Sequence, residues 1–211
     1  MNPLKSLAAE GQSPWYDSIS RDMISSGELA RLIESDGLKG VTSNPAIFEK
    51  AMTKGSSYDA LLRAAVAEGV TDPKGLFERL AVPDIRDAAD VLRPVFDASG
   101  GADGFVSLEV SPDLAYDAAG TAAEAARLFA AVGRPNVMIK IPATKPGLAA
   151  VAQTIAAGIP VNVTLIFSLE RYMGVMNAYL DGLERRLKAG GDLAPVASVA
   201  SFFVSRIDTA V

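Results

Sequence analysis

Short apolar runs alternate with helical patterns along most of this chain, and that alternation restricts the folds open to it. The runs that we interpret as buried strands lie at residues 15–19, 40–43, 104–110, 137–141, 161–167 and 195–203. Most of the segments between them carry apolar side chains at helical spacing, as in 113–132 and 169–187. Buried strands that are joined by helices pair in parallel. The sequence therefore predicts an α/β fold built around a parallel sheet.

Two architectures satisfy this pattern, a closed (β/α)8 barrel and an open doubly wound sheet. The nucleotide-binding motifs typical of the open sheet are missing, since no Gly-x-Gly-x-x-Gly follows the first strand and no P-loop sequence occurs. Residues 45–103 are too many for a single connection, and we expect them to form a helical insertion. The expected helices lie near 46–52, 58–68, 72–80 and 84–97, with a break at Val82-Pro83 because proline interrupts helices.

The number of strands falls short of a complete barrel. We expect six strands, whereas a (β/α)8 barrel has eight. Residues 207–211 follow the last strand without the pattern of a finishing helix. We therefore expect one barrel domain over residues 1–211 that is incomplete at its C-terminal end. If Val211 were the natural terminus, the first and sixth strands would present unpaired edges beside exposed apolar surface.

One lysine lies inside the fourth strand. Lys140 belongs to the run VMIKIP at residues 137–142, with apolar neighbours on both sides. Burying an ammonium group is costly unless it is paired, so burial favours the neutral amine. A neutral amine can attack a carbonyl and form a Schiff base. The alternative is a structural lysine that extends from the strand end or pairs with a carboxylate.

Composition restricts the chemistry further. The 211 residues include no cysteine and no histidine, which excludes disulfides, thiol nucleophiles, Ser-His mechanisms and metal sites built on those residues. Proton transfer must fall to Asp, Glu, Lys, Tyr or water. The net charge of −5 argues against a general binder of nucleic acid or of membrane surfaces. The absence of cysteine and of a visible targeting segment suggests the cytoplasm, and the composition is consistent with a chemistry that needs neither a cofactor nor a metal.

The uncharged stretch 146–169 needs a separate explanation. It is long enough to span a bilayer. It also contains Gly158-Ile159-Pro160 near its middle, and Gly and Pro mark the ends of helices. We therefore expect a helix ending near Gly158 and then a buried strand, and no association with a membrane.

Polar side chains lie at the ends of the expected strands, where barrel enzymes place their catalytic groups. In chain order they are Asp17, Thr42, Ser43, Asn44, Glu109, Lys140, Asn162, Thr164, Ser201, Ser205 and Arg206. Singly, most have a structural explanation, such as capping a turn, bonding to backbone or facing solvent. Glu109 fits that explanation least, because an unpaired carboxylate inside an apolar strand is costly. Together these residues would surround Lys140, as a Schiff-base aldolase requires.

The motifs around these positions resemble those of the transaldolases. The matching stretches are WYDSISR at 15–21, GVTSNPAIF at 40–48, SLEV at 107–110, IKIPAT at 139–144, VNVTLIFS at 161–168 and SFFVSRID at 201–208. They follow one another in family order over nearly the whole chain. The long insertion and the late position of the lysine favour the longer type over the short fructose-6-phosphate aldolase branch. The resemblance implies a (β/α)8 barrel of the class I aldolase type, with about six β/α units present.

The resemblance also implies a role for each candidate. Lys140 forms the Schiff base with a ketose phosphate, and Asp17 is the general base on the C4 hydroxyl. Glu109 moves protons through a water that Thr164 partly holds. Substrate binding falls to Thr42, Asn44, Asn162, Ser201, Phe203 and Arg206, the last of them through the phosphate.

The activity implied is a transfer in the pentose phosphate pathway. A dihydroxyacetone unit would move from sedoheptulose 7-phosphate to glyceraldehyde 3-phosphate. Two alternatives stay open, namely aldolase-type cleavage at the same lysine and a barrel fragment without catalytic activity. The expected partners are sugar phosphates. The sequence leaves a homodimer and a fused isomerase domain open.

Overall fold

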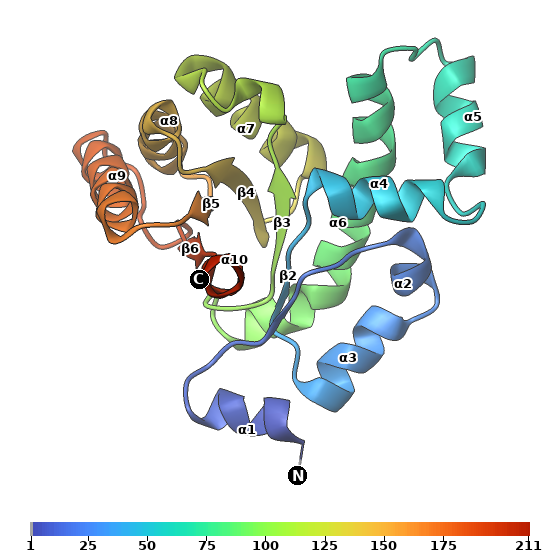
Figure 1. The fold of residues 1–211 in the computed structure, drawn as a ribbon, viewed down its shortest axis with the longest axis horizontal. Helices are drawn as coiled ribbons and strands as arrows, with labels where there is room; N and C mark the ends of the chain where they lie inside the picture. Colours follow the sequence, from blue (N-terminus) through green and yellow to red (C-terminus); the bar gives the residue numbers. More distant parts are fainter. Residues whose placement is uncertain (1) are drawn as a thin grey trace. The chain divides into compact units, whose positions relative to one another are not determined.

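The computed structural model describes residues 2–211, which form strands and helices in alternation (Figure 1). The strands in this part of the chain are β1 (Trp15–Tyr16), β2 (Gly40–Val41), β3 (Phe105–Glu109), β4 (Val137–Pro142), β5 (Val161–Ile166) and β6 (Ser198–Phe202). The pairs β1–β2, β2–β3, β4–β5 and β5–β6 are parallel, and the sheet order is that of the sequence. The predicted α/β fold with six parallel strands is confirmed. Its strand order is that of the first six units of a (β/α)8 barrel.

Helices occupy most of the connections. They are α1 (Pro3–Ala9), α2 (Arg21–Ser25), α3 (Glu28–Asp36), α4 (Pro45–Thr53), α5 (Asp59–Ala67), α6 (Pro73–Ala98), α7 (Ala118–Val132), α8 (Lys145–Ala156), α9 (Leu169–Lys188) and α10 (Val204–Ala210), with a short 3-10 helix η1 (Pro112–Leu114). Side-chain oxygens of Ser20, Asp72 and Thr144 accept backbone N–H groups at three helix starts, as N-caps do. The chain divides into two compact units. The first runs to Leu108 and includes Ala131–Val137, and the second holds Glu109–Ala130 and Met138–Val211.

In the first unit, the segment after β2 is helical, as predicted. Helix α6 runs unbroken for 26 residues through Pro83 and Pro94, so the predicted break at Val82-Pro83 is wrong. A proline inside a helix removes one backbone donor. Here tertiary packing outweighs that local cost. The buried stripe continues across Pro83 through Leu80, Ala81, Asp84, Ile85, Ala88, Ala89 and Leu92. Helices α2, α3 and α5 contact α6 (Figure 1).

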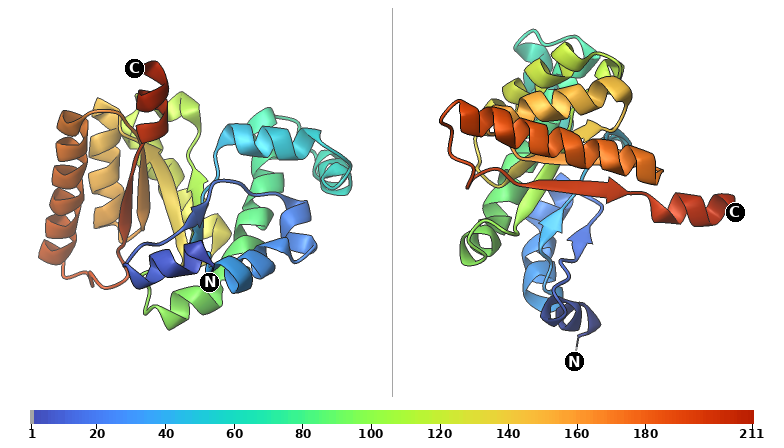
Figure 2. Two further views of the ribbon diagram at one scale, coloured as in Figure 1. Left: turned by 60° about the horizontal axis from the view of Figure 1, so that its bottom comes forward. Right: turned by 90° about the vertical axis from the view of Figure 1, so that its left-hand side faces the viewer.

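In the second unit, α8 and α9 lie side by side along the strands (Figure 2). Helix α8 contacts β5, and α9 contacts β5 and β6. The uncharged stretch 146–169 is therefore most of α8 followed by the buried strand β5, as predicted. In the part of the chain that the structure describes, no helix combines the length and the apolar character needed to cross a bilayer.

The ends of the strands differ from the expectation. Strands β1 and β2 have two residues each and are shorter than the predicted runs 15–19 and 40–43. Strand β6 begins at Ser198 and not at Pro195. After it, α10 occupies residues 204–210, where no finishing helix was predicted, and it continues beyond the end of β6 (Figure 2). Helix α10 has only seven residues and buries none of them, and so short a segment offers little helical periodicity from which to predict it.

Candidate active site

The second unit places a buried amine beside a carboxylate. Lys140 is only 5% exposed, and every residue of β4 is buried. Its Nζ lies 3.3 Å from Oε2 of Glu109, the last residue of β3. The backbone fixes this arrangement, since the N–H of Val110 donates to the carbonyl of Lys140 at 3.1 Å. The burial predicted for Lys140 is thus observed, and the carboxylate beside it can take a proton from the amine.

Strand β5 brings two more predicted residues to the neighbouring positions. In the parallel register, Asn162 is opposite Lys140 and Thr164 is opposite Pro142. The hydroxyl of Ser201 in β6 donates to Oδ1 of Asn162 at 2.8 Å. Oγ1 of Thr164 is buried, and it has no hydrogen-bond partner among residues 2–211. Buried hydroxyls are normally satisfied, so Thr164 can take a water or a substrate oxygen.

The backbone of β5 is irregular directly after Thr164. Leu165 has φ 62°, the left-handed region, and the β5–β6 register shifts between Val163 and Ile166. For a residue other than glycine this conformation costs about 1–2 kcal/mol. Bulges of this kind occur next to active sites, where they change the direction of a side chain. No sequence pattern indicated this strain, because VNVTLIFS has the composition of a regular strand.

Aromatic rings and one arginine follow β6. The ring of Phe203 lies 5.6 Å from that of Phe167, measured between centroids. The guanidinium carbon of Arg206 lies 5.2 Å from the centroid of Phe203, within the range of a cation–π interaction. Arg206 is on α10 and exposed. The arrangement holds a cation at the surface, where it can meet a phosphate.

The remaining predicted residues belong to the first unit. Asp17 follows β1 directly and is exposed. Thr42 donates its backbone N–H to the carbonyl of Tyr16 at 2.9 Å, while its buried Oγ1 has no partner in the described chain. Oδ1 of Asn44 accepts the N–H of Ile47 at 2.9 Å and caps α4, so the turn role that the sequence allowed is real. Of the ten residues to which the resemblance gives a role, seven thus lie in the second unit and these three in the first.

Comparison with known proteins decides the family. Residues 14–211 match the family described as Transaldolase/Fructose-6-phosphate aldolase. The chain belongs to this family. It is 55% identical over 208 residues to Transaldolase 1 of Streptomyces coelicolor and 51% identical over 208 residues to Transaldolase 2 of Nostoc punctiforme. It is 51% identical over 211 residues to a transaldolase of Mycobacterium marinum.

The matched part of these transaldolases is about half of each. The alignments cover 99% to 100% of this chain but only 54% to 56% of the relatives. The chain therefore spans about half the length of the curated relatives it matches. The resemblance inferred from the motifs is confirmed.

One cluster in this transaldolase-family chain was missed by the sequence analysis. Asp84 is 1% exposed, and its carboxylate accepts from the guanidinium of Arg21 and the hydroxyl of Tyr58. Burial raises the pKa of Asp84 from 3.8 to about 6, although the hydrogen bond from Tyr58 and the charge of Arg21 act to lower it. Burial and the bond to Asp84 raise the pKa of Tyr58. A carboxylate inside the apolar stripe of α6 was the available signal.

Proposed function

We propose that the whole protein is a transaldolase of the pentose phosphate pathway that acts in the cytoplasm. It would move a dihydroxyacetone unit from sedoheptulose 7-phosphate to glyceraldehyde 3-phosphate, giving erythrose 4-phosphate and fructose 6-phosphate. The observation that carries the proposal is the buried amine of Lys140, 3.3 Å from the carboxylate of Glu109. The relatives named transaldolase support the reaction class.

The first stage is formation of the Schiff base. The amine of Lys140 attacks the C2 carbonyl, a C–N bond forms, and the carbonyl electrons move to oxygen to give a carbinolamine. Glu109 takes a proton from the nitrogen and delivers one to the departing hydroxyl, so that water leaves and an iminium remains. The buried hydroxyl of Thr164 is suited to hold the water that carries these protons.

The second stage is cleavage and transfer. Asp17 takes the proton of the C4 hydroxyl, the C3–C4 bond breaks, and its electron pair moves into the iminium to form an enamine. The aldose phosphate leaves. The enamine carbon then attacks the carbonyl of the acceptor aldehyde while Asp17 returns the proton, and hydrolysis releases the product from Lys140. Asn44 and Asn162 would hold the hydroxyls of the three-carbon unit.

The substrate would be bound mainly at its phosphate end and along its hydroxyls. Arg206 carries the positive charge for the phosphate and is held over the ring of Phe203. Phe203 then limits the width of the site. The hydroxyl of Ser201 is oriented by its bond to Asn162, and the buried hydroxyl of Thr42 is a further candidate donor to sugar oxygens.

Product analysis tests this proposal against the second candidate, an aldolase, which the description of the family also covers. The full-length protein would receive fructose 6-phosphate with and without erythrose 4-phosphate as acceptor. A transaldolase forms sedoheptulose 7-phosphate and glyceraldehyde 3-phosphate only when the acceptor is present. An aldolase would release free dihydroxyacetone without an acceptor as fast as with one, and that result would support the second candidate. Absence of both turnover and a covalent adduct would support the inactive alternative.

A further inference from the structure

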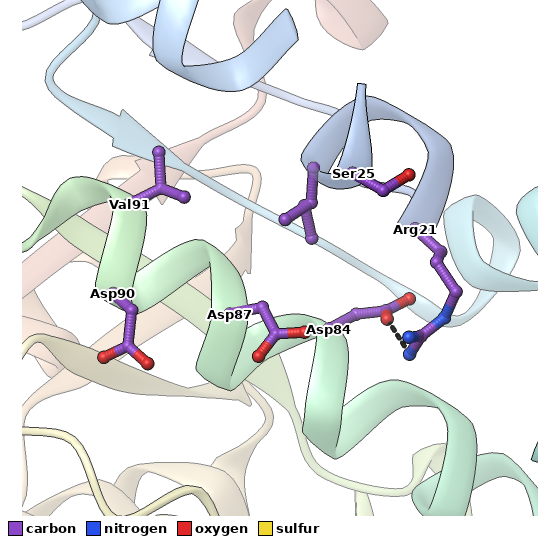
Figure 3. A pocket seen from close by; sticks show the side chains of 7 residues that line it. Arg21, Ser25, Asp84, Asp87, Asp90 and Val91 are labelled. Atoms are coloured by element: carbon purple, nitrogen blue, oxygen red, sulfur yellow. Dashed lines mark hydrogen bonds and ion pairs between the residues drawn. The ribbon is translucent and has the colours of Figure 1, made fainter. Parts of the chain in front are cut away.

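A buried carboxylate ties the long helix α6 to the start of α2. Asp84 occupies a position of the apolar stripe of α6, and it is 1% exposed. One of its oxygens, Oδ1, pairs with the guanidinium of Arg21, the first residue of α2. Figure 3 shows the two side chains pointing toward each other from their helices, beside a cavity of about 240 Å³ that Asp87 and Asp90 also line. An ion pair therefore replaces an apolar contact in this stripe.

Tyr58 provides a second link between Asp84 and Arg21. Its hydroxyl donates to Oδ2 of Asp84 at 2.6 Å and accepts the backbone N–H of Arg21 at 2.9 Å. Its ring also lies 5.5 Å from the guanidinium carbon of Arg21. Tyr58 is 4% exposed. Both the backbone and the side chain of Arg21 are thus held, one through Tyr58 and the other directly.

The segment that these bonds hold contains Asp17. At its near end, the carbonyl of Tyr16 accepts from the N–H of Thr42 at 2.9 Å. At its far end, Ser20 caps α2 and Arg21 is held by Tyr58 and Asp84. Ile19 between them is 1% exposed. Asp17 itself is exposed, so its position depends on the anchoring of the backbone on either side.

The ion pair of Asp84 is better suited to fixing the position of Arg21 than to stabilising the fold. Burying a carboxylate and a guanidinium costs desolvation energy that their attraction repays only in part, and an apolar residue of similar volume often stabilises a protein more. What the ion pair supplies is direction, since each carboxylate oxygen accepts one defined donor. The charged and titratable groups that face Asp84 are Arg21, Tyr58, Asp87 and Asp22.

We propose that Asp84 is a positioning residue for Asp17, because it holds the backbone of residues 17–21 in one arrangement through Arg21 and Tyr58. This rests on the proposed function, in which Asp17 is the general base for C3–C4 cleavage. A displacement of about 1 Å at a catalytic group can cost on the order of 10²-fold in rate. Loss of Asp84 therefore slows cleavage and leaves Schiff-base formation at Lys140 intact.

Three substitutions in the full-length protein test this. Asp84→Asn keeps the shape but removes the negative charge, so the ion pair with Arg21 is lost, and the Tyr58 hydroxyl can no longer donate to a carboxylate oxygen if the amide N–H faces it. Tyr58→Phe removes the link to the N–H of Arg21. Asp87→Asn is the matched control, because Asp87 lies one turn further along α6, is exposed and lines the same cavity.

Two kinds of measurement are needed for each variant. Amide hydrogen exchange over residues 17–21 reports the anchoring itself, whatever the activity. We expect exchange about tenfold faster in Asp84→Asn and Tyr58→Phe than in the wild type. For transfer from fructose 6-phosphate to erythrose 4-phosphate, kcat should fall roughly 10- to 100-fold, and KM should stay within about threefold of the wild type. Borohydride trapping on Lys140 in Asp84→Asn and Tyr58→Phe should match that of the wild type. For the control Asp87→Asn, exchange, kinetics and trapping should all match the wild type.

The outcomes separate the two proposals. Unchanged exchange over residues 17–21 in a folded Asp84→Asn protein would overturn the anchoring. Equal losses of trapping and cleavage would also overturn it, since they indicate general damage. If Asp84→Asn does not fold, the milder Tyr58→Phe decides by the same readouts. A wild type that neither forms the adduct nor cleaves sugar phosphate refutes the proposed function, and with it any catalytic role of Asp84, even where the exchange data show the anchor.

Discussion

Nζ of Lys140 lies 3.3 Å from Oε2 of Glu109, and the two side chains are only 7% and 16% exposed. A buried pair of this kind adds little net stability, because desolvation offsets the attraction. The same pair is well suited to proton transfer, since the carboxylate can accept the proton that the amine must lose before it attacks a carbonyl. The two explanations predict different consequences when Glu109 is changed.

Glu109→Gln should slow the formation of the covalent adduct. The amide cannot accept the proton of the amine or deliver one to the departing hydroxyl, so we expect a loss of about 10²- to 10⁴-fold. The rate of borohydride trapping with fructose 6-phosphate measures it, with Glu170→Gln at the exposed start of α9 as the control. Trapping at the wild-type rate would show that Glu109 only pairs with Lys140 and does not transfer protons.

Asp17→Asn should affect the later step. The adduct on Lys140 should form at close to the wild-type rate, whereas C3–C4 cleavage should fall about 10²- to 10⁴-fold, because no base takes the C4 proton. Single-turnover experiments separate the two rates. A variant that still cleaves fructose 6-phosphate but yields no trapped adduct would mean that the roles of Asp17 and Glu109 are wrongly assigned.

Asp84 should give stability a distinctive pH dependence. Its pKa is raised from 3.8 to about 6, so its contribution to stability is fully present below about pH 4 and is lost as the pH rises through about 6. Relative to Asp84→Asn, the wild type should lose about 3 kcal/mol of unfolding free energy between pH 4 and pH 7. Urea unfolding of both proteins at the two pH values measures this difference.

Asp90 on the same helix should show the opposite pH dependence of stability and serves as a control. The hydrogen bond from Arg134 lowers the pKa of Asp90, so its contribution is present above the ordinary carboxyl pKa and is lost as the pH falls. The difference between the wild type and Asp90→Asn should therefore persist at pH 4 and shrink only as the pH falls below the ordinary carboxyl pKa of 3.8. If both variants change in the same direction with pH, the environment of Asp84 is not the one described.

Two glycines of α9 should respond differently to alanine. A Cβ at Gly182 would lie 2.6 Å from Cβ of Ile155 and 2.8 Å from the carbonyl oxygen of Ala152, both on α8. At Gly174 it would meet only the flexible Cδ1 of Leu148, at 2.9 Å. Alanine gains about 1 kcal/mol in helix propensity, but overpacking costs about 1–3 kcal/mol. Thermal unfolding should show Gly182→Ala destabilised and Gly174→Ala unchanged or stabilised. Equal effects would contradict the close packing of α8 against α9.

The parts of the fold that depend on local pattern could be predicted, and those that depend on distant partners could not. Strand β4 is a continuous apolar run, so the burial of Lys140 followed from its neighbours. The break expected at Pro83 was wrong, because contacts of α6 with other helices decide whether that helix continues. The partners of Asp84, Tyr58 and Arg21, lie 26 and 63 residues away in sequence. No local pattern joins them.

The candidate site divides in the same way. The sequence predicted Lys140 and Glu109 as site residues because each is an ionisable side chain within an apolar strand. The strained backbone at Leu165 and the unsatisfied hydroxyl of Thr164 became evident only in three dimensions. Sequence patterns carry residue identity and periodicity, whereas hydrogen-bond satisfaction and backbone strain depend on the folded neighbours.

The most direct test of the central claim is to locate the covalent adduct. The full-length protein is treated with fructose 6-phosphate and borohydride, digested, and analysed by peptide mass spectrometry. We expect the reduced adduct on Lys140, its loss in Lys140→Met, and its retention in Lys145→Met, where an exposed lysine only five residues away is replaced. An adduct that persists at the wild-type level in a folded Lys140→Met protein would contradict the account.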